Sequence, residues 1–191
     1  DGSLWCWASN RLGMMGVGST EPASDVPKPI GMMKDWQAVA ASSEHYCAIR
    51  SGELYCWGVG GNGQLGLGNY ASHDTPQRIG SATTWTHLAL GNRHGCAIRS
   101  GALYCWGLGT DGQLGTNDTG TQNSPQRVGT GSDWTDVAAG YAHTCGRRGS
   151  TIYCWGANQY GQIGNGGNSN DVTAPSQVAL HNDWQKVVTG L

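Results

Sequence analysis

Short runs of apolar and aromatic residues alternate with Gly-rich polar turns along the whole chain. Between residues 134 and 183, the runs 134–139, 143–148 and 151–156 each predict a strand, and a shorter fourth strand is expected at 175–178. No stretch has the 3.6-residue apolar period of a helix. The pattern therefore predicts an all-β chain in which helices are scarce.

A four-residue pattern, an aromatic residue followed by Cys, Trp and a small residue, occurs four times at a nearly constant spacing. It begins at Trp5, Tyr55, Tyr104 and Tyr153, which gives steps of 50, 49 and 49 residues. The same step separates three further sets: Trp36, Trp85, Trp134 and Trp184; Pro27, Pro76, Pro125 and Pro175; His45, His94 and His143. A period near 49 residues with four short strands is typical of a β-propeller blade. We expect units at about 1–35, 36–84, 85–133 and 134–183, with residues 184–191 starting the next.

A single blade cannot bury both faces of its sheet, so each blade needs neighbours. We interpret the recurring Trp, Leu and Tyr residues as the core between adjacent blades. The composition agrees with many tight turns around aromatic strands, because the chain has 32 Gly and 9 Trp but no Phe.

Charge and hydropathy exclude several partners. The formal net charge is −2, and Arg147-Arg148 is the longest basic cluster, so the sequence predicts no nucleic-acid footprint. No apolar run reaches the ~18 residues that a membrane-spanning helix needs, so membrane insertion is not expected. The chain starts in the middle of a repeat, which suggests a segment of a longer protein.

Six of the seven cysteines form pairs with eight residues between partners: Cys47 and Cys56, Cys96 and Cys105, Cys145 and Cys154. Two-residue hairpin loops at 51–52, 100–101 and 149–150 would place each pair directly opposite across a hairpin. The pairs would be non-hydrogen-bonded, with Cα atoms about 4.5 Å apart, at the short end of the disulfide range. Zinc ligation and reduced structural thiols are the alternatives, but zinc sites prefer short Cys-x-x-Cys knuckles with convergent ligands.

Disulfides indicate an oxidising compartment: extracellular, cell-surface or periplasmic. By the same hairpin rule, the partner of Cys6 would lie four residues upstream of Asp1, so we expect Cys6 to be unpaired by truncation.

The motifs resemble a known family. Residues 140–145 read Gly-Tyr-Ala-His-Thr-Cys, residues 153–156 read Tyr-Cys-Trp-Gly, and residues 161–164 read Gly-Gln-Ile-Gly. With Gly-Gln-Leu-Gly at 63–66 and 112–115, these segments are similar to the repeat of the regulator of chromosome condensation family. The first unit departs from it, with Gly-Met-Met-Gly at 13–16 and Ala8 in place of Gly. The resemblance covers the whole chain and implies a propeller that typically has seven blades, of which this chain would supply part.

The resemblance also suggests functions to weigh. The name-giving member is a nucleotide exchange factor on chromatin, and paired cysteines with a slightly acidic balance argue against that role here. Plant ultraviolet-B receptors of the family have Gly-Trp-Arg-His-Thr segments, whereas residues 91–95 here read Gly-Asn-Arg-His-Gly. A secreted bacterial member inhibits β-lactamases with one propeller face, and its compartment makes it the nearest parallel.

A search for chemistry finds no nucleophile elbow, phosphate loop or paired carboxylates, so we expect no enzyme, no cofactor and no metal. His45, His94 and His143 occur once per blade and are interpreted as structural hydrogen-bonding residues. Residues 60–65 resemble a calcium turn but lack its Asp ligand. Asn117, with Asp118 and Thr119, forms one N-glycosylation sequon.

Function is expected on segments that vary between repeats, since a scaffold repeats and a site need not. Residues 67–75, 116–124 and 165–174 vary most and would emerge on one side of the ring. They are either solvated linkers or a binding face, with these candidate binding residues: Tyr70, His73, Asp74, Asn117, Asp118, Asn168, Asn170 and Asp171. The favoured hypothesis is an extracytoplasmic scaffold that binds a protein partner through these loops. The alternatives are a secreted enzyme inhibitor of the β-lactamase-inhibitor type and a repeat domain appended to an enzyme.

Overall fold

Each of the last three units folds into a four-stranded antiparallel sheet. The computed structural model describes residues 1–19, 21–168, 171–178 and 183–190. Within them lie a two-stranded sheet and three sheets of four strands, which we call the first, second and third sheets. The two-stranded sheet pairs β1 (Trp5–Ser9) with β2 (Ala23–Pro29), and a short 3₁₀ helix, η1 (Arg11–Gly13), lies between these strands in the chain.

The strands of each sheet follow one another in chain order. The first sheet has β3 (Trp36–Ala41), β4 (His45–Arg50), β5 (Glu53–Gly58) and β6 (His73–Arg78). The second has β7 (Trp85–Leu90), β8 (His94–Arg99), β9 (Ala102–Gly107) and β10 (Gln122–Arg127). The third has β11 (Trp134–Ala139), β12 (His143–Arg148), β13 (Thr151–Gly156) and β14 (Val172–Gln177).

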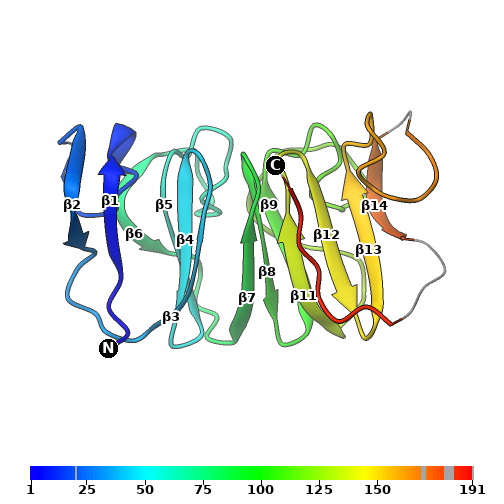
Figure 1. The fold of residues 1–191 in the computed structure, drawn as a ribbon, viewed down its shortest axis with the longest axis horizontal. Coiled ribbons are helices and arrows are strands. Elements are labelled where there is room, and N and C mark those ends of the chain that lie inside the picture. Colours follow the sequence, from blue (N-terminus) through cyan, green and yellow to red (C-terminus); the bar gives the residue numbers. More distant parts are fainter. Residues whose placement is uncertain (20, 169–170, 179–182, 191) are drawn as a thin grey trace.

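The sheets stand side by side in a row (Figure 1). The first strands of successive sheets contact one another, β3 with β7 and β7 with β11, so they form the inner edge of the row. The fourth strands β6, β10 and β14 are the opposite edges of their sheets. The all-β prediction and the four-stranded antiparallel blade are confirmed.

The strands predicted at 134–139, 143–148 and 151–156 form with those bounds. The fourth strand also forms, but with different bounds. It was expected at 175–178, but β14 begins at Val172 and ends at Gln177. Val172 pairs with Gly156, and a bulge separates this contact from the pairing of Tyr153 with Gln177. The irregular edge strand accommodates Pro175, which has no backbone N–H to donate to a ladder.

Three disulfides cross the central hairpins, at the pairs predicted from the sequence: Cys47–Cys56, Cys96–Cys105 and Cys145–Cys154. Each pair is in direct register, with Cα atoms 4.1 Å apart. The six cysteines are buried. Each ten-residue loop is expected to contribute about 2–3 kcal/mol through chain entropy.

Adjacent units are held together by a repeated tryptophan contact. The Trp106 indole N–H donates to the carbonyl of Gln64 in the preceding unit at 2.9 Å, and Trp155 donates to the Gln113 carbonyl at 3.0 Å. Trp57 makes the same bond to the Met14 carbonyl at 3.0 Å. Because the acceptor is a backbone carbonyl, the change from Gln to Met in the first unit leaves this contact intact.

The Gly that ends each of these turns is required by the indole above it. At Gly115, φ is +70°, and a Cβ atom would lie 2.6 Å from Trp155 Nε1. Trp57, Trp106 and Trp155 are almost fully buried between units, as the packing interpretation predicted. Trp7, at the equivalent position of the first unit, is 57% exposed because no described sheet packs on that side of β1.

Candidate interaction face

All long connections of the three sheets emerge on one side, which we call the loop face. The pairing of His45 with Gly58, and of Gly58 with His73, places the end of β3 and the turn to β6 at the same end of the first sheet. The second and third sheets repeat this arrangement, and Figure 1 shows these connections along the upper edge. The loop face comprises the turns 42–44, 91–93 and 140–142 and the described residues of the connections 59–72, 108–121 and 157–171.

Five of the predicted binding residues are exposed on the loop face: Tyr70, Asn117, Asp118, Asn168 and Asp171. Asn170 lies outside the described residues. Asn117 has a φ of +68°, and its backbone N–H donates to the Thr173 carbonyl at 2.9 Å. The Asp118 carboxylate accepts from the Gly120 N–H at 2.9 Å, which orders the connection locally. A binding role for these residues stays a prediction.

The expectation that residues 67–75 form one loop is wrong at its end. His73 and Asp74 are half-buried in β6, and the Asp74 carbonyl accepts from the Gly18 N–H at 2.9 Å. The fourth strand of one unit thus packs against the turn of the preceding one. Residues 122–124 and 172–174 likewise belong to β10 and β14, so the variable loops are shorter than predicted.

Two tyrosines that were not among the candidates stand out on the loop face. Tyr141 is 60% exposed in the turn after β11, and Tyr160 is 90% exposed in the connection after β13. Both line a hollow of about 630 Å³ with His143, Asp111 and Gln162. The equivalents of Tyr141 in earlier units are Ser43 and Asn92, so an aromatic residue at a polar position was the available signal.

Two of the three repeated histidines, His45 and His94, are buried and hydrogen-bonded, as predicted. His94 Nε2 lies 2.9 Å from the Thr144 hydroxyl of the third sheet, and that hydroxyl donates to the Gln113 carbonyl at 2.9 Å. His45 instead contacts the Ser42 hydroxyl through Nδ1 at 2.7 Å. Burial lowers the pKa of His45 and of His94 to about 3, with a smaller effect from the neighbouring histidine, so both rings are neutral at pH 7.

The Gln of each Gly-Gln-Leu-Gly turn closes that turn through its side chain. Gln64 Oε1 accepts from the Asn62 N–H at 2.7 Å, and Gln113 Oε1 accepts from the Asp111 N–H at 2.9 Å. Among the described residues, no group of three or more His, Cys, Asp or Glu side chains could hold a metal ion. The described part of the chain also has no helix long and apolar enough to cross a membrane.

Cys6 is half-buried on β1, opposite Lys28, and makes no disulfide with a described residue. Burial raises the pKa of its thiol. An upstream partner for Cys6 stays a prediction.

These features define a repeat protein of the β-propeller class, with a uniform interior and a variable face. Models of the regulator of chromosome condensation (RCC1) repeat match residues 51–98, 100–146 and 150–190. A second model of the same repeat matches residues 134–162. Because the matches cover more than half of the chain, it belongs to the RCC1 repeat family.

Similar curated proteins share short segments. The chain is 30% identical over 70 residues to the probable E3 ubiquitin-protein ligase HERC6 of Homo sapiens, which is 35% of this chain and 7% of that protein. It is 39% identical over 72 residues to the Protein RCC2 homolog of Xenopus laevis, which is 36% of this chain and 14% of that protein. The matched segments are therefore a small part of these relatives.

Solved structures show the same fold over most of the chain. Yeast RCC1 (Prp20) bound to Kap60 superposes with a TM-score of 0.81 at 20% identity, covering 93% of this chain and 45% of that chain. Human WBSCR16 gives a TM-score of 0.79 at 24% identity, covering 93% and 48%. The chain thus spans about half the length of these propellers.

Proposed function

We propose that the chain is an interaction scaffold that works outside the cytoplasm and binds a protein partner through the loop face. The observation that carries this proposal is the set of exposed tyrosines, Tyr70, Tyr141 and Tyr160, all of which lie on the loop face. Tyrosine offers a large, rigid, amphipathic contact area and is enriched in protein interfaces. The sheets beneath supply a rigid support, because each is crossed by a buried disulfide.

The cysteines support the proposed compartment. Three disulfides in register, one per sheet, are the pattern of a chain that folds under oxidising conditions. A nuclear exchange factor on chromatin needs basic contacts, and the formal net charge of −2 of this chain does not suit them. Mass spectrometry of the native protein, alkylated without reduction, tests this. We expect the six paired cysteines to stay unmodified, and free alkylation of all six would overturn the extracytoplasmic placement.

The binding proposal is tested by removing the tyrosines. The triple variant Tyr70→Ser, Tyr141→Ser, Tyr160→Ser should lose a partner cross-linked to the parent protein in the native extracellular fraction. Truncating an interface aromatic costs about 2 kcal/mol or more at a hot spot, which is a loss of roughly thirtyfold or more in affinity. The matched control is Met32→Ser, because Met32 is 93% exposed but lies in the linker between β2 and β3, away from the loop face.

Retention of the partner by the triple variant, with loss in the Met32→Ser control, would contradict the assignment to the loop face. Far-ultraviolet circular dichroism and thermal unfolding of both variants establish that the sheets remain folded.

A second candidate is favoured by the comparisons. The HERC6 match covers 7% of that ligase, so the repeat occurs there within a much longer protein. As this second candidate, we infer that the chain serves as the partner-binding module of an enzyme. The mass of the mature native protein tests it: a species of about the size of this chain or of one propeller excludes an appended catalytic domain.

A further inference from the structure

Three equivalent hollows lie between adjacent units, at the side of the sheets. Each is lined by a Trp, an Arg and a Tyr of one sheet and by a Pro of its fourth strand: Trp36, Arg50, Tyr55 and Pro76; Trp85, Arg99, Tyr104 and Pro125; Trp134, Arg148, Tyr153 and Pro175. Their volumes are about 320, 430 and 280 Å³. We call the largest, on the second sheet, the Arg99 hollow.

The Arg99 hollow differs from the other two in charge. Arg50 pairs with Asp35 at 2.6 Å, and Arg148 pairs with Asp133 at 2.8 Å. The residue at the same distance before Arg99 is Thr84, which has no charge. Thr84 does conserve one hydrogen bond of Asp35. The Thr84 hydroxyl accepts from the Ser100 hydroxyl, as the Asp35 carboxylate accepts from the equivalent Ser51 hydroxyl.

A second acidic residue of the first sheet is also missing from the second sheet. Glu53 is the cross-strand partner of Arg50. Its carboxylate forms an ion pair with Arg78 at 2.8 Å and accepts a hydrogen bond from the Tyr55 hydroxyl at 2.6 Å. Ala102 takes its place opposite Arg99. Arg127, the equivalent of Arg78, keeps the bond to a linker carbonyl, to Thr130 at 3.0 Å where Arg78 bonds to Ser81 at 3.2 Å, but it lacks the carboxylate.

Two guanidinium groups therefore share one face of the second sheet without a compensating charge. The register places Arg99, Tyr104 and Arg127 on that face, because directly paired residues point to the same side. Among the described residues, neither arginine has a carboxylate within ion-pair distance. The surface here is positive although the chain as a whole is slightly acidic.

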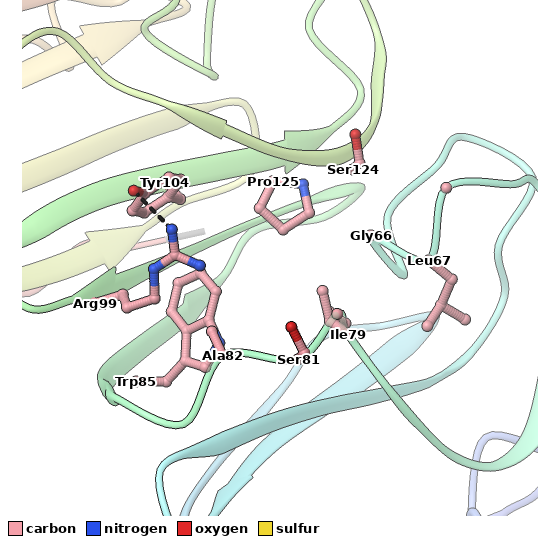
Figure 2. A pocket seen from close by; sticks show the side chains of 12 residues that line it. Gly66, Leu67, Ile79, Ser81, Ala82, Trp85, Arg99, Tyr104, Ser124 and Pro125 are labelled. Atoms are coloured by element: carbon pink, nitrogen blue, oxygen red, sulfur yellow. Dashed lines mark hydrogen bonds between the residues drawn. The ribbon is translucent and has the colours of Figure 1, made fainter.

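The Arg99 guanidinium is held in place before any ligand arrives. It lies 5.1 Å from the centre of the Trp85 ring and 4.5 Å from the centre of the Tyr104 ring, and it donates to the Tyr104 hydroxyl at 2.9 Å (Figure 2). That is its one hydrogen bond among the described residues, so most of its five donors are free. A guanidinium fixed by aromatic rings loses little entropy when it binds a planar anion.

The walls of the hollow are largely apolar. Leu67 and Ile79 come from the preceding unit, Ala82 from the linker, and Pro125 from β10 (Figure 2). A carboxylate matches the guanidinium fork in bidentate geometry, and the apolar walls suit aliphatic groups beside it. A phosphate could pair with the guanidinium, but it has no apolar group to pack against the walls.

We propose that the Arg99 hollow binds an acidic side chain, Asp or Glu, flanked by aliphatic residues in a segment of a partner protein. The inference rests on the proposed function only in taking the ligand to be a protein. The hollow meets the loop face at residues 66–68, but none of the three exposed tyrosines lines it. The carboxylate of the partner would neutralise Arg99. Within the chain, Asp35 does this for Arg50 and Asp133 does it for Arg148.

The test is a titration of the intact, isotope-labelled protein followed by nuclear magnetic resonance. The ligands are the capped tripeptides acetyl-Leu-Glu-Leu-amide and acetyl-Leu-Gln-Leu-amide, together with acetate and inorganic phosphate. We expect the glutamate peptide to shift the Arg99 Nε–H and Trp85 indole signals saturably, and to leave the Trp36 and Trp134 indoles unchanged. The glutamine peptide should bind about tenfold or more weakly, since it lacks the charge-assisted hydrogen bonds.

The matched variant is Thr84→Asp, which installs the carboxylate present in the other two sheets. It should abolish the response to the glutamate peptide while thermal unfolding shows an intact fold. Unchanged peptide binding by Thr84→Asp would overturn the proposal. So would phosphate or acetate binding as tightly as the peptide, which would reveal a simple anion site.

The loop-face variant separates the two proposals. Tyr70→Ser, Tyr141→Ser, Tyr160→Ser should bind the glutamate peptide as the parent does, whatever happens to the loop-face partner. Loss of peptide binding in that variant would place the peptide on the loop face and so contradict the Arg99 assignment.

Discussion

His94 on the second sheet and Thr144 on the third form a buried hydrogen bond between neighbouring units, with Nε2 and Oγ1 2.9 Å apart. Because the Thr144 hydroxyl donates its proton to the Gln113 carbonyl, His94 Nε2 must carry the proton in the contact. The first sheet lacks this bond, since Gly95 stands at the position of Thr144 and His45 Nε2 has no partner among the described residues.

Thr144→Val should destabilise the protein by about 1–3 kcal/mol, because it leaves the buried His94 N–H without an acceptor. The Gln113 carbonyl keeps the Trp155 indole as a donor and adds little to this cost. Urea denaturation measures the change. Thr144→Ser retains the hydroxyl and should be clearly less damaging, and equal losses in both variants would show that the hydroxyl does not matter.

Stability should fall as the pH drops from about 6.5 towards 3. The buried His45 and His94 have a pKa of about 3 when folded, against an ordinary 6.5, so the unfolded chain binds protons in this range and the folded chain does not. Between pH 7 and 5, each histidine should remove about 2 kcal/mol from the free energy of unfolding.

Denaturation midpoints at pH 7, 6 and 5 measure this effect, and histidine resonances that stay constant over the same range would identify the two buried rings. Equal midpoints at pH 7 and 5 would contradict the buried, neutral state of His45 and His94.

Gly115→Ala should break the contact between the second and third units. The new Cβ would lie 2.6 Å from Trp155 Nε1 and displace the indole from the Gln113 carbonyl. We expect a loss of about 3 kcal/mol or more, from the overpacking and the broken hydrogen bond together. Gly129→Ala is the control, because its φ of +59° is similar but nothing lies within 4 Å of its Cβ. That variant should lose only the backbone term, about 1–2 kcal/mol.

Replacing Cys96 and Cys105 together by Ser should cost about 2–3 kcal/mol, with a further penalty because both side chains are fully buried. Thermal unfolding with and without reductant measures the loss. Reductant should lower the melting temperature of the parent more than that of the double variant. An equal response would mean that the bond between Cys96 and Cys105 contributes nothing.

Local chemistry in the sequence was enough to predict much of the fold. The spacing of Cys145 and Cys154 around a two-residue loop fixed the hairpin register, and the repeat of Trp134 at equal steps defined the unit. The start of β14 was missed, because a bulge between the Cys154 and Gly156 pairings places residues 173–175 opposite the single residue 155 and leaves no mark in the hydrophobic pattern.

The sites were less predictable than the strands. Tyr160 differs from Asn62 and Asp111 at the same repeat position, but only the folded chain shows that it shares a hollow with Tyr141. The neutral Thr84 is visible in the sequence as well. Its meaning depends on the contact between Asp35 and Arg50 across 15 residues, which no local pattern predicts.

The tryptophan contacts between units also have a direction. Trp57, Trp106 and Trp155 each reach back to a carbonyl in the unit before their own, so every acceptor leaves the ribosome ahead of its donor. A newly made unit can dock as soon as its hairpin closes, without waiting for residues still to be synthesised. The row of sheets can therefore grow vectorially, one unit at a time, in the order in which the chain is translated.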